Sequence, residues 1–295
     1  MKIWNFSNGQ CLKDLLSMDG KAKVDNEITA LVSIHDPNNL DSDTRIPHFV
    51  GVGWDKTLHI WTDERNDDET INVDRDLPKE QENITVTKHK TDIMSCVYDV
   101  EKNLIFTGGH EGSLLAWHFE TGFSKYSLHE KDKTCTSEDY VRESKSVDCL
   151  VIMQQLRLLM SGSSDGYIRF WDLNDLSKEQ PLVFKMHVDH DEEDSLTAIA
   201  CTDDCNRLIT GCTGGRIKCW DLSKASLRND DDPMKKIRVS WYIQAHKKDG
   251  RGSINTLNIV ENYASISDKF IVSAAQDNNI LLHRLSNGVR VGQFN

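Results

Sequence analysis

The densest group of metal-binding side chain types in this sequence lies at residues 187–194. His187 and His190 stand among five acidic residues there, which are Asp189, Asp191, Glu192, Glu193 and Asp194. Imidazole and carboxylate groups are common ligands of divalent cations. The spacing, however, lacks the central glycine and the terminal glutamate of an EF-hand calcium loop. We therefore interpret this segment as a solvated acidic loop and predict no metal.

The eight cysteines are the next candidates for chemistry. They stand at Cys11, Cys96, Cys135, Cys149, Cys201, Cys205, Cys212 and Cys219. The closest pairs are separated by three and six residues, and neither matches the paired short knuckles of a zinc site. Most of these cysteines fall where a strand places a small buried residue, so we expect reduced thiols in the core.

Catalytic motifs are not found in a plausible local context. We find no Ser/His/Asp or Cys/His constellation and no glycine-rich phosphate loop. We therefore predict that the protein is not an enzyme, with no catalytic residue and no cofactor. Its function should depend on binding.

A recurring hairpin supplies the elements that position the polar residues. In its clearest copy, residues 159–173, an apolar run ends at Leu159-Met160, Ser164-Asp165-Gly166 provides a turn, and the next strand reaches Trp171. Five copies share one register of a small residue, a turn position and a residue six further on. They are Gly51/Asp55/Trp61, Thr107/Glu111/Trp117, Ser161/Asp165/Trp171, Thr210/Gly214/Trp220 and Ser273/Asp277/His283.

This repeat resembles the WD40 β-propeller, whose blades end their third strand on a Trp-Asp pair. Trp171-Asp172 and Trp220-Asp221 carry the pair literally, and Trp4-Asn5 is a degenerate copy in an amino-terminal remnant. Successive Trp-equivalent positions lie 57, 56, 54, 49 and 63 residues apart. The resemblance implies an all-β fold, a WD40 β-propeller with five complete blades plus a half blade at the amino terminus.

The resemblance also implies a buried hydrogen-bond chain in each blade, from a histidine through a hydroxyl and an acid to the indole. Pairing each donor with an acceptor avoids a buried unsatisfied group, which costs about 1–3 kcal/mol. The implied members are His89, Thr107, Glu111 and Trp117; Ser161, Asp165 and Trp171; Thr210 and Trp220; His246, Ser273 and Asp277; and Asp55 with Trp61. Gly214 replaces one acid, His283 replaces one indole, and His190 is a third candidate for the histidine role, in the blade that follows it.

We assign the whole chain, 1–295, to one propeller domain. The blade boundaries predicted from the repeat are 1–16 for the half blade, then 27–88, 89–128, 147–186, 196–245 and 254–295. Any fourth strand of the 27–88 blade is expected near residues 70–73. Because the remnant at 1–16 lacks two inner strands, we expect the missing blades to come from the rest of a longer chain or from another chain.

The charge of the protein limits its partners. The net charge is −12 and the sequence pI is about 5.4, which argues against a nucleic-acid footprint or an anionic membrane surface. Acidic residues concentrate at residues 63–82, and the candidate partner contacts there are Asp67, Asp68 and Glu69. Trp54, before a turn acid, either anchors a partner or packs against the neighbouring blade. With no signal peptide or long apolar run, we expect a cytoplasmic protein.

A narrower resemblance rests on residues 2–12, Val52-Gly53-Trp54-Asp55, residues 89–97 and the hairpin at 112–117. These segments are similar, in the same order, to the large EF-hand-associated WD-repeat proteins of motile cilia. The resemblance implies a non-catalytic scaffold of the ciliary or flagellar axoneme that binds adaptor or coiled-coil proteins. The alternative is the substrate receptor of a ubiquitin ligase or another cytoplasmic adaptor, although Asn174 and Ser223 occupy the positions where ligase-binding propellers carry arginine.

Overall fold

The computed structural model describes a set of separate ranges of the chain. These are residues 2–4, 11–14, 28–34, 48–62, 64–65, 71–72, 89–130, 146–178, 181–188, 190, 194–230, 232–247, 251–261 and 269–294. For residues 2–4, 11–14, 48, 61–62, 64–65 and 71–72 only the backbone path is described.

Most described residues belong to antiparallel sheets whose strands follow one another in sequence. Four of these sheets have four strands: β8 (Ile93–Asp99), β9 (Leu104–Gly109), β10 (Leu114–His118) and β11 (Ser124–Leu128); β12 (Val147–Met153), β13 (Leu158–Ser163), β14 (Tyr167–Asp172) and β15 (Leu182–His187); β16 (Leu196–Cys201), β17 (Arg207–Cys212), β18 (Arg216–Asp221) and β19 (Arg238–Gln244); and β20 (Ile254–Val260), β21 (Phe270–Ala275), β22 (Ile280–Arg284) and β23 (Arg290–Phe294). A further described sheet has three strands: β3 (Ile28–Ile34), β4 (His48–Gly53) and β5 (Leu58–Thr62).

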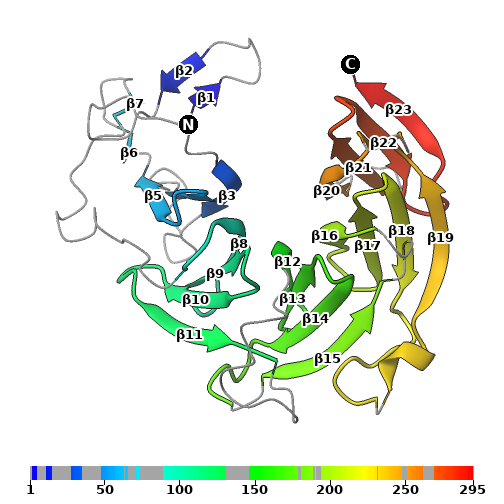
Figure 1. Ribbon diagram of the computed structural model, residues 1–295, viewed down its shortest axis with the longest axis horizontal. Helices are drawn as coiled ribbons and strands as arrows, with labels where there is room; N and C mark the ends of the chain where they lie inside the picture. Colours follow the sequence, from blue (N-terminus) through cyan, green and yellow to red (C-terminus); the bar gives the residue numbers. More distant parts are fainter. Residues whose placement is uncertain are drawn as a thin grey trace.

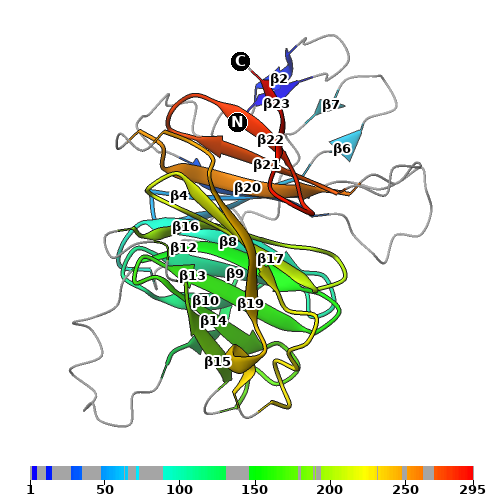
Figure 2. The ribbon, with the colours of Figure 1, turned by 90° about the vertical axis from the view of Figure 1, so that its right-hand side faces the viewer.

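The five sheets are the blades of a β-propeller. Figure 1 shows them arranged radially in an arc, with the first strand of each sheet toward the centre and β11, β15, β19 and β23 at the outer rim. Figure 2, which faces the right-hand side of Figure 1, shows the rim strand β19 in front. The predicted all-β propeller fold is confirmed.

Each blade begins with a bulged strand. In all five blades the pairing of the first strand with the second shifts register directly after its first residue, as between Ile93 and Ser95. Side chains alternate along a regular strand, so residues three apart would face opposite sides; one extra residue puts them on the same side. The first and fourth residues of each inner strand, such as Ile93 and Cys96, therefore point together toward the preceding blade.

Apolar clusters between neighbouring blades form the core. One cluster joins Val50 and Val52 of the first described blade to Ile93 and Trp117 of the next, and three similar clusters continue around the arc. Phe106 and Phe170 are fully buried in these interfaces. Burial of one large apolar side chain stabilises the fold by about 1.5–3 kcal/mol, so blade-to-blade packing dominates the stability.

Two short strand pairs lie outside the five sheets. β1 (Lys2–Trp4) pairs with β2 (Cys11–Asp14), at the place of the predicted half blade. β6 (Glu64–Arg65) pairs with β7 (Ile71–Asn72), so the strand expected near residues 70–73 forms but does not become the fourth strand of the β3–β5 sheet. Its two residues are too few to build the ladder that the other fourth strands make. Within the described residues no helix has the length and apolar composition needed to cross a membrane.

Candidate functional site: the inner-turn face

The buried hydrogen-bond chain is fully formed in the β8–β11 blade. Trp117 Nε1 donates to Thr107 Oγ1 at 2.7 Å, and His89 Nε2 lies 2.8 Å from the same oxygen. Ser113 continues the chain: its hydroxyl lies 2.9 Å from His89 Nδ1 and donates to Glu111 Oε1 at 3.1 Å. Glu111 thus joins through Ser113, since its carboxylate makes no direct bond to His89 in the described contacts.

The β12–β15 blade has a shorter chain than expected. Trp171 Nε1 donates to Ser161 Oγ at 2.8 Å. Asp165 does not take part: it accepts from the Tyr167 amide at 2.9 Å and pairs with Arg169 at 2.8 Å. Among the described contacts Asp165 therefore does not join the Ser161–Trp171 chain as expected, because Arg169, four residues along the strand, pairs with its carboxylate. Burial raises the pKa of Asp165, but the Arg169 and Tyr167 contacts outweigh it and hold the pKa below its usual value.

The β16–β19 blade recruits its polar partners from the preceding loop. His190 Nε2 lies 3.0 Å from Thr210 Oγ1, which also accepts from Trp220 Nε1 at 3.0 Å. The acid missing at Gly214 is replaced by Asp194, whose carboxylate occupies the space beside that glycine: a Cβ at Gly214 would lie 2.6 Å from Asp194 Oδ1. The 187–194 segment thus supplies structural contacts to the next blade.

In the β20–β23 blade the hydrogen-bond chain ends at the Ser273 hydroxyl. His246 bridges Ser273 at 2.9 Å and Asp277 at 3.1 Å. His283 occupies the indole position and is 2% exposed, and its Nδ1 has no hydrogen-bond partner among the described residues. Burial, followed by the charges of His246 and Arg290, lowers the pKa of His283 to about 4. His283 is therefore held neutral.

The β4–β5 turn holds the remaining sequence candidates. Asp55 accepts from the Thr57 amide at 3.0 Å and pairs with His59 at 2.6 Å. Trp54 is 48% exposed, so about half of its surface is accessible to a partner. The side chain of Trp61 lies outside the described residues, as do Asp67, Asp68 and Glu69.

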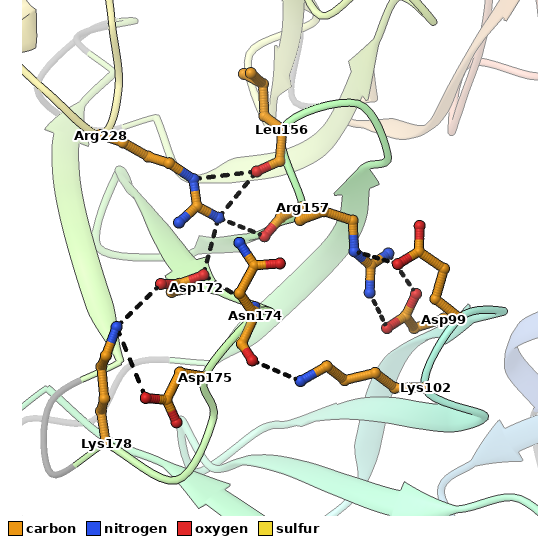
Figure 3. A network of polar contacts seen from close by, with 10 residues as sticks. Asp99, Lys102, Leu156, Arg157, Asp172, Asn174, Asp175, Lys178 and Arg228 are labelled. Atoms are coloured by element: carbon orange, nitrogen blue, oxygen red, sulfur yellow. Dashed lines mark hydrogen bonds and ion pairs between the residues drawn. The ribbon is translucent and has the colours of Figure 1, made fainter.

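A second polar network crosses three blades and links turns between first and second strands to the ends of third strands and the β18–β19 connection. We call this side of the molecule the inner-turn face; it comprises the turns at 100–103, 154–157 and 202–206 and the end of β20. Arg157 forms two hydrogen bonds to Asp99, at 2.8 and 2.7 Å, and a 3.0 Å ion pair with Glu101 (Figure 3). The Asp99 carboxylate is completely buried. Parallel bonds of this kind between guanidinium and carboxylate are directional and strong, so they tie the β8 blade to the β12 blade.

Arg228 makes the corresponding link from the next blade. Its guanidinium donates to Asp172 Oδ1 at 2.8 Å and to the carbonyls of Leu156 and Arg157 at 2.9 and 3.0 Å (Figure 3). Burial raises the pKa of Asp172, but its Arg228 and Asn174 hydrogen bonds outweigh burial and keep the pKa low. The second residue of a Trp-Asp pair is thus occupied within the propeller.

The conformation of Arg157 points to a constraint at this position. Its φ is 51°, in the left-handed region that side chains other than glycine and asparagine rarely adopt. Asn103 has the same left-handed conformation at the equivalent turn of the preceding blade, with φ 54°. A bulky residue in this region is strained by about 1–3 kcal/mol, which other contacts must offset. The two Asp99 bonds provide that offset.

Beside this network the inner strands of three blades line an open groove of about 460 Å³. Its walls are Val151, Ile199, Ala200, Cys201, Asp203, Leu257, Asn258, Ile259, Val260 and Glu261. Val260 is 46% exposed, and Asp203 and Asn258 are also exposed. Glu261 pairs with Lys269 at 2.8 Å. The groove combines an apolar wall with exposed polar and acidic groups, which suits a peptide segment.

Cys201, which lines this groove, and Cys205 form a thiol pair with a distinct electrostatic environment. The contact with Cys201 lowers the pKa of Cys205, whereas the same contact, together with burial, raises the pKa of Cys201. The cysteines that the structure describes are free thiols. Within those same residues no group of three or more His, Cys, Asp or Glu side chains is placed to hold a metal ion.

The sequence reasoning missed Asp99, Arg157 and Arg228, and it interpreted Asp194 only as part of a solvated loop. Only Arg157 had a local signal, because a tight turn with neither glycine nor asparagine at its left-handed position is unusual. The others act across 20 to 58 residues of sequence, beyond any local pattern.

Comparison with known proteins finds a matching repeat family and similar proteins. The family described as "WD domain, G-beta repeat" matches residues 134–172 and 181–221. The chain is 26% identical over 213 residues to Mitochondrial division protein 1 of Eremothecium gossypii, covering 66% of this chain and 27% of that protein. It is 30% identical over 135 residues to Protein ROOT INITIATION DEFECTIVE 3 of Arabidopsis thaliana, covering 43% of this chain and 28% of that protein.

The chain thus spans less than a third of the length of these relatives. The matched repeats include the Trp171-Asp172 and Trp220-Asp221 pairs, and both lie in four-stranded blades with an indole-to-hydroxyl bond. Over the residues that the structure describes, this protein is a five-bladed β-propeller, and its segments 134–172 and 181–221 match the WD40 repeat.

Proposed function

We propose that this chain is a non-catalytic scaffold and that its inner-turn face binds an extended segment of a protein partner. The observation that carries the proposal is the groove of about 460 Å³ lined by three inner strands. Propellers position binding surfaces at the ends of strands held by a rigid framework. The cross-blade network of Arg157 and Arg228 makes this face rigid, so little ordering is needed on binding.

The chemistry of the groove suggests the kind of segment it accepts. Val260 and the partly exposed Ile259 offer an apolar wall, while Asp203 and Glu261 add carboxylates to the lining. The net charge of −12 adds long-range attraction for a cation. We therefore propose a partner segment with an apolar side chain next to lysine or arginine, bound by complementary charge and apolar contact.

Proximity labelling of the tagged full chain in intact cells tests this binding mode. The groove variant is Asp203→Lys with Asn258→Lys; both residues are exposed lining positions. The matched control is Asp232→Lys with Asn255→Lys, which makes the same changes at exposed positions outside the groove. We expect at least one protein that the wild type and the control both label to be lost with the groove variant. Identical labelling by all three chains would contradict the groove as the binding site.

We also propose that the scaffold acts in the axoneme of cilia or flagella, on adaptor or coiled-coil proteins. The support is the colinear resemblance of residues 2–12, 52–55, 89–97 and 112–117 to axonemal WD-repeat proteins. The names of the two relatives concern mitochondrial division and root initiation. Enrichment of axonemal proteins in the same labelling experiment supports this location. Enrichment of ubiquitin-ligase subunits supports the receptor alternative, and enrichment of neither class contradicts both.

A further inference from the structure

Two cysteines share the turn between β16 and β17, on the inner-turn face. Cys201 ends β16, and the amide of Cys205 closes the turn by donating to the Thr202 carbonyl at 2.8 Å. Cys201 Sγ donates to the same carbonyl at 3.4 Å. Cys205 Sγ donates to the next carbonyl along the chain, that of Asp203, at 3.8 Å. The turn therefore gathers two thiols over two consecutive peptide groups.

The two sulfurs also contact each other. A hydrogen bond joins the two side chains, and both belong to one apolar cluster between blades. The φ of Cys205 is 57°, in the left-handed region, and the corresponding turns of the two preceding blades have Asn103 and Arg157 there. Glycine and asparagine suit this conformation best. The backbone of the turn therefore gives no reason for a cysteine, and its side chain is the feature to explain.

The surroundings of the pair favour one thiolate. Cys205 accepts a hydrogen bond from Cys201 and further ones from the backbone N–H groups of Gln155 and Leu156, in the turn of the preceding blade. The Cys201 contact and these amides hold the pKa of Cys205 below its usual value, although burial opposes them. The same contact, together with burial, raises the pKa of Cys201, so the proton stays on Cys201.

Solvent reaches the pair from the groove. Cys201 lines the groove of about 460 Å³ and is partly exposed, whereas Cys205 behind it is 6% exposed. Over the described part of the chain, no cluster of three or more His, Cys, Asp or Glu side chains could hold a metal here. A thiolate in contact with a second thiol has another characteristic reaction, which is oxidation to a disulfide through a sulfenic acid.

We propose that Cys201 and Cys205 form a redox couple that hydrogen peroxide closes to a reversible disulfide. The Cys205 thiolate attacks one peroxide oxygen, the O–O bond breaks, and the released hydroxide takes up a proton to become water. The Cys201 sulfur then attacks the sulfenic sulfur of Cys205. The S–S bond forms, and the sulfenic hydroxyl leaves with the Cys201 proton as a second water. Two thiols thus lose two electrons to one peroxide, whether or not the groove binds a partner.

Mass spectrometry of the folded full chain tests the proposal, because trypsin releases both cysteines in one peptide, residues 186–207. The protein is treated with hydrogen peroxide, its free thiols are blocked with iodoacetamide, and it is then digested. We expect the wild-type peptide to carry no alkyl group and to be two hydrogens lighter than the dithiol form. Dithiothreitol added before the blocking step should restore a peptide alkylated on both cysteines.

Single variants separate the roles of the two sulfurs. Cys201→Ser should stop at the sulfenic acid of Cys205, which dimedone labels, whereas Cys205→Ser should keep Cys201 as a free thiol. The matched control is Cys212→Ser, a buried thiol of the same blade, which should form the disulfide as the wild type does. Burial raises the pKa of Cys212 to about 11, so Cys205 should oxidise at least about tenfold faster than Cys212.

Three outcomes would overturn the proposal. The first is a wild-type peptide that remains alkylated on both Cys201 and Cys205 after peroxide treatment. The second is a disulfide from either of them to a third cysteine. The third is a Cys201→Ser protein in which dimedone labels Cys205 no faster than Cys212. The first two readouts use the wild type, so they remain decisive if a variant fails to fold.

Discussion

At the scale of single residues, the stability lost on replacing a buried tryptophan depends on whether its hydroxyl partner keeps another hydrogen bond. Trp171 and Trp220 are both nearly buried, at 3% and 6% exposure, and each indole donates to one hydroxyl. Thr210 has His190 as a second hydrogen-bond partner. The hydrogen-bond partner described for the Ser161 hydroxyl is the Trp171 indole. The two sites thus differ in hydrogen bonding rather than in size.

We expect Trp171→Ala to destabilise the protein more than Trp220→Ala. Each variant loses a large aromatic, which costs roughly 3–5 kcal/mol. Trp171→Ala also leaves the buried Ser161 hydroxyl unpaired, which adds about 1 kcal/mol or more. Urea unfolding at constant slope measures the difference. Trp117→Ala is the control. In this variant Thr107 keeps its hydrogen bond with His89, so the loss of stability should match that of Trp220→Ala. Equal midpoints for all three variants would refute the argument.

Arg157 offers a second residue-scale prediction. Arg157→Ala should lower the free energy of unfolding by about 3–5 kcal/mol, because it leaves the Asp99 carboxylate buried and unpaired. Asparagine tolerates the left-handed φ of 51°, but it carries no charge to pair with Asp99. Arg157→Asn therefore tests backbone strain separately from the ion pair. Chemical denaturation should show both variants destabilised. A stable Arg157→Asn variant would mean that the turn conformation, and not the ion pair, matters.

At the scale of elements, a loop can supply the acidic side chain that a neighbouring turn lacks. The β17–β18 turn has a glycine where other blades have an acid, and the loop before β16 provides Asp194 in its place. Asp194 accepts from Cys212 Sγ at 3.3 Å and lies 3.5 Å from Arg216. A carboxylate introduced at residue 214 would lie against the Asp194 carboxylate.

We therefore expect Gly214→Asp, which restores the repeat pattern, to destabilise the protein rather than strengthen it. The new Cβ would overlap Asp194, and two adjacent carboxylates repel each other. Adding Asp194→Gly in the same chain removes both problems and should recover much of the lost stability. Thermal unfolding of the single and double variants measures this. A stabilised Gly214→Asp protein would show that Asp194 does not fill the acid position.

At the scale of the whole molecule, buried neutral histidines couple folding to pH. Burial lowers the pKa of His89 to about 4, with Glu111 opposing, and the pKa of His283 is lowered to a similar value. In the unfolded chain a histidine takes up a proton near pH 6.5. The stabilisation is therefore complete above about pH 6.5 and is lost as the pH falls from there toward 4.

We expect the urea midpoint to fall steadily between pH 6.5 and 4.5, with a loss on the order of 3 kcal/mol per histidine at the acid end. His283→Trp removes one titrating group and places an indole where the other blades have one, so its pH dependence should be less steep. Unfolding curves at several pH values compare the two proteins. The same slope in both would exclude His283 as a source of the pH dependence.

Sequence alone determined the features that repeat locally. The register of Thr107 with Trp117, Ser161 with Trp171 and Thr210 with Trp220 places both members of each pair on adjacent strands of one hairpin, ten residues apart. Hairpin register follows from turn length and alternation, so these bonds, the all-β class and the blade order were predictable.

Tertiary structure alone decided the contacts between blades. Arg157 meets Asp99 across 58 residues, and Arg228 meets Asp172 across 56. No period of the sequence encodes which turn faces which, because that depends on the angle between packed sheets. Local periodicity specifies a blade, whereas the packing of whole sheets determines which residues of neighbouring blades meet.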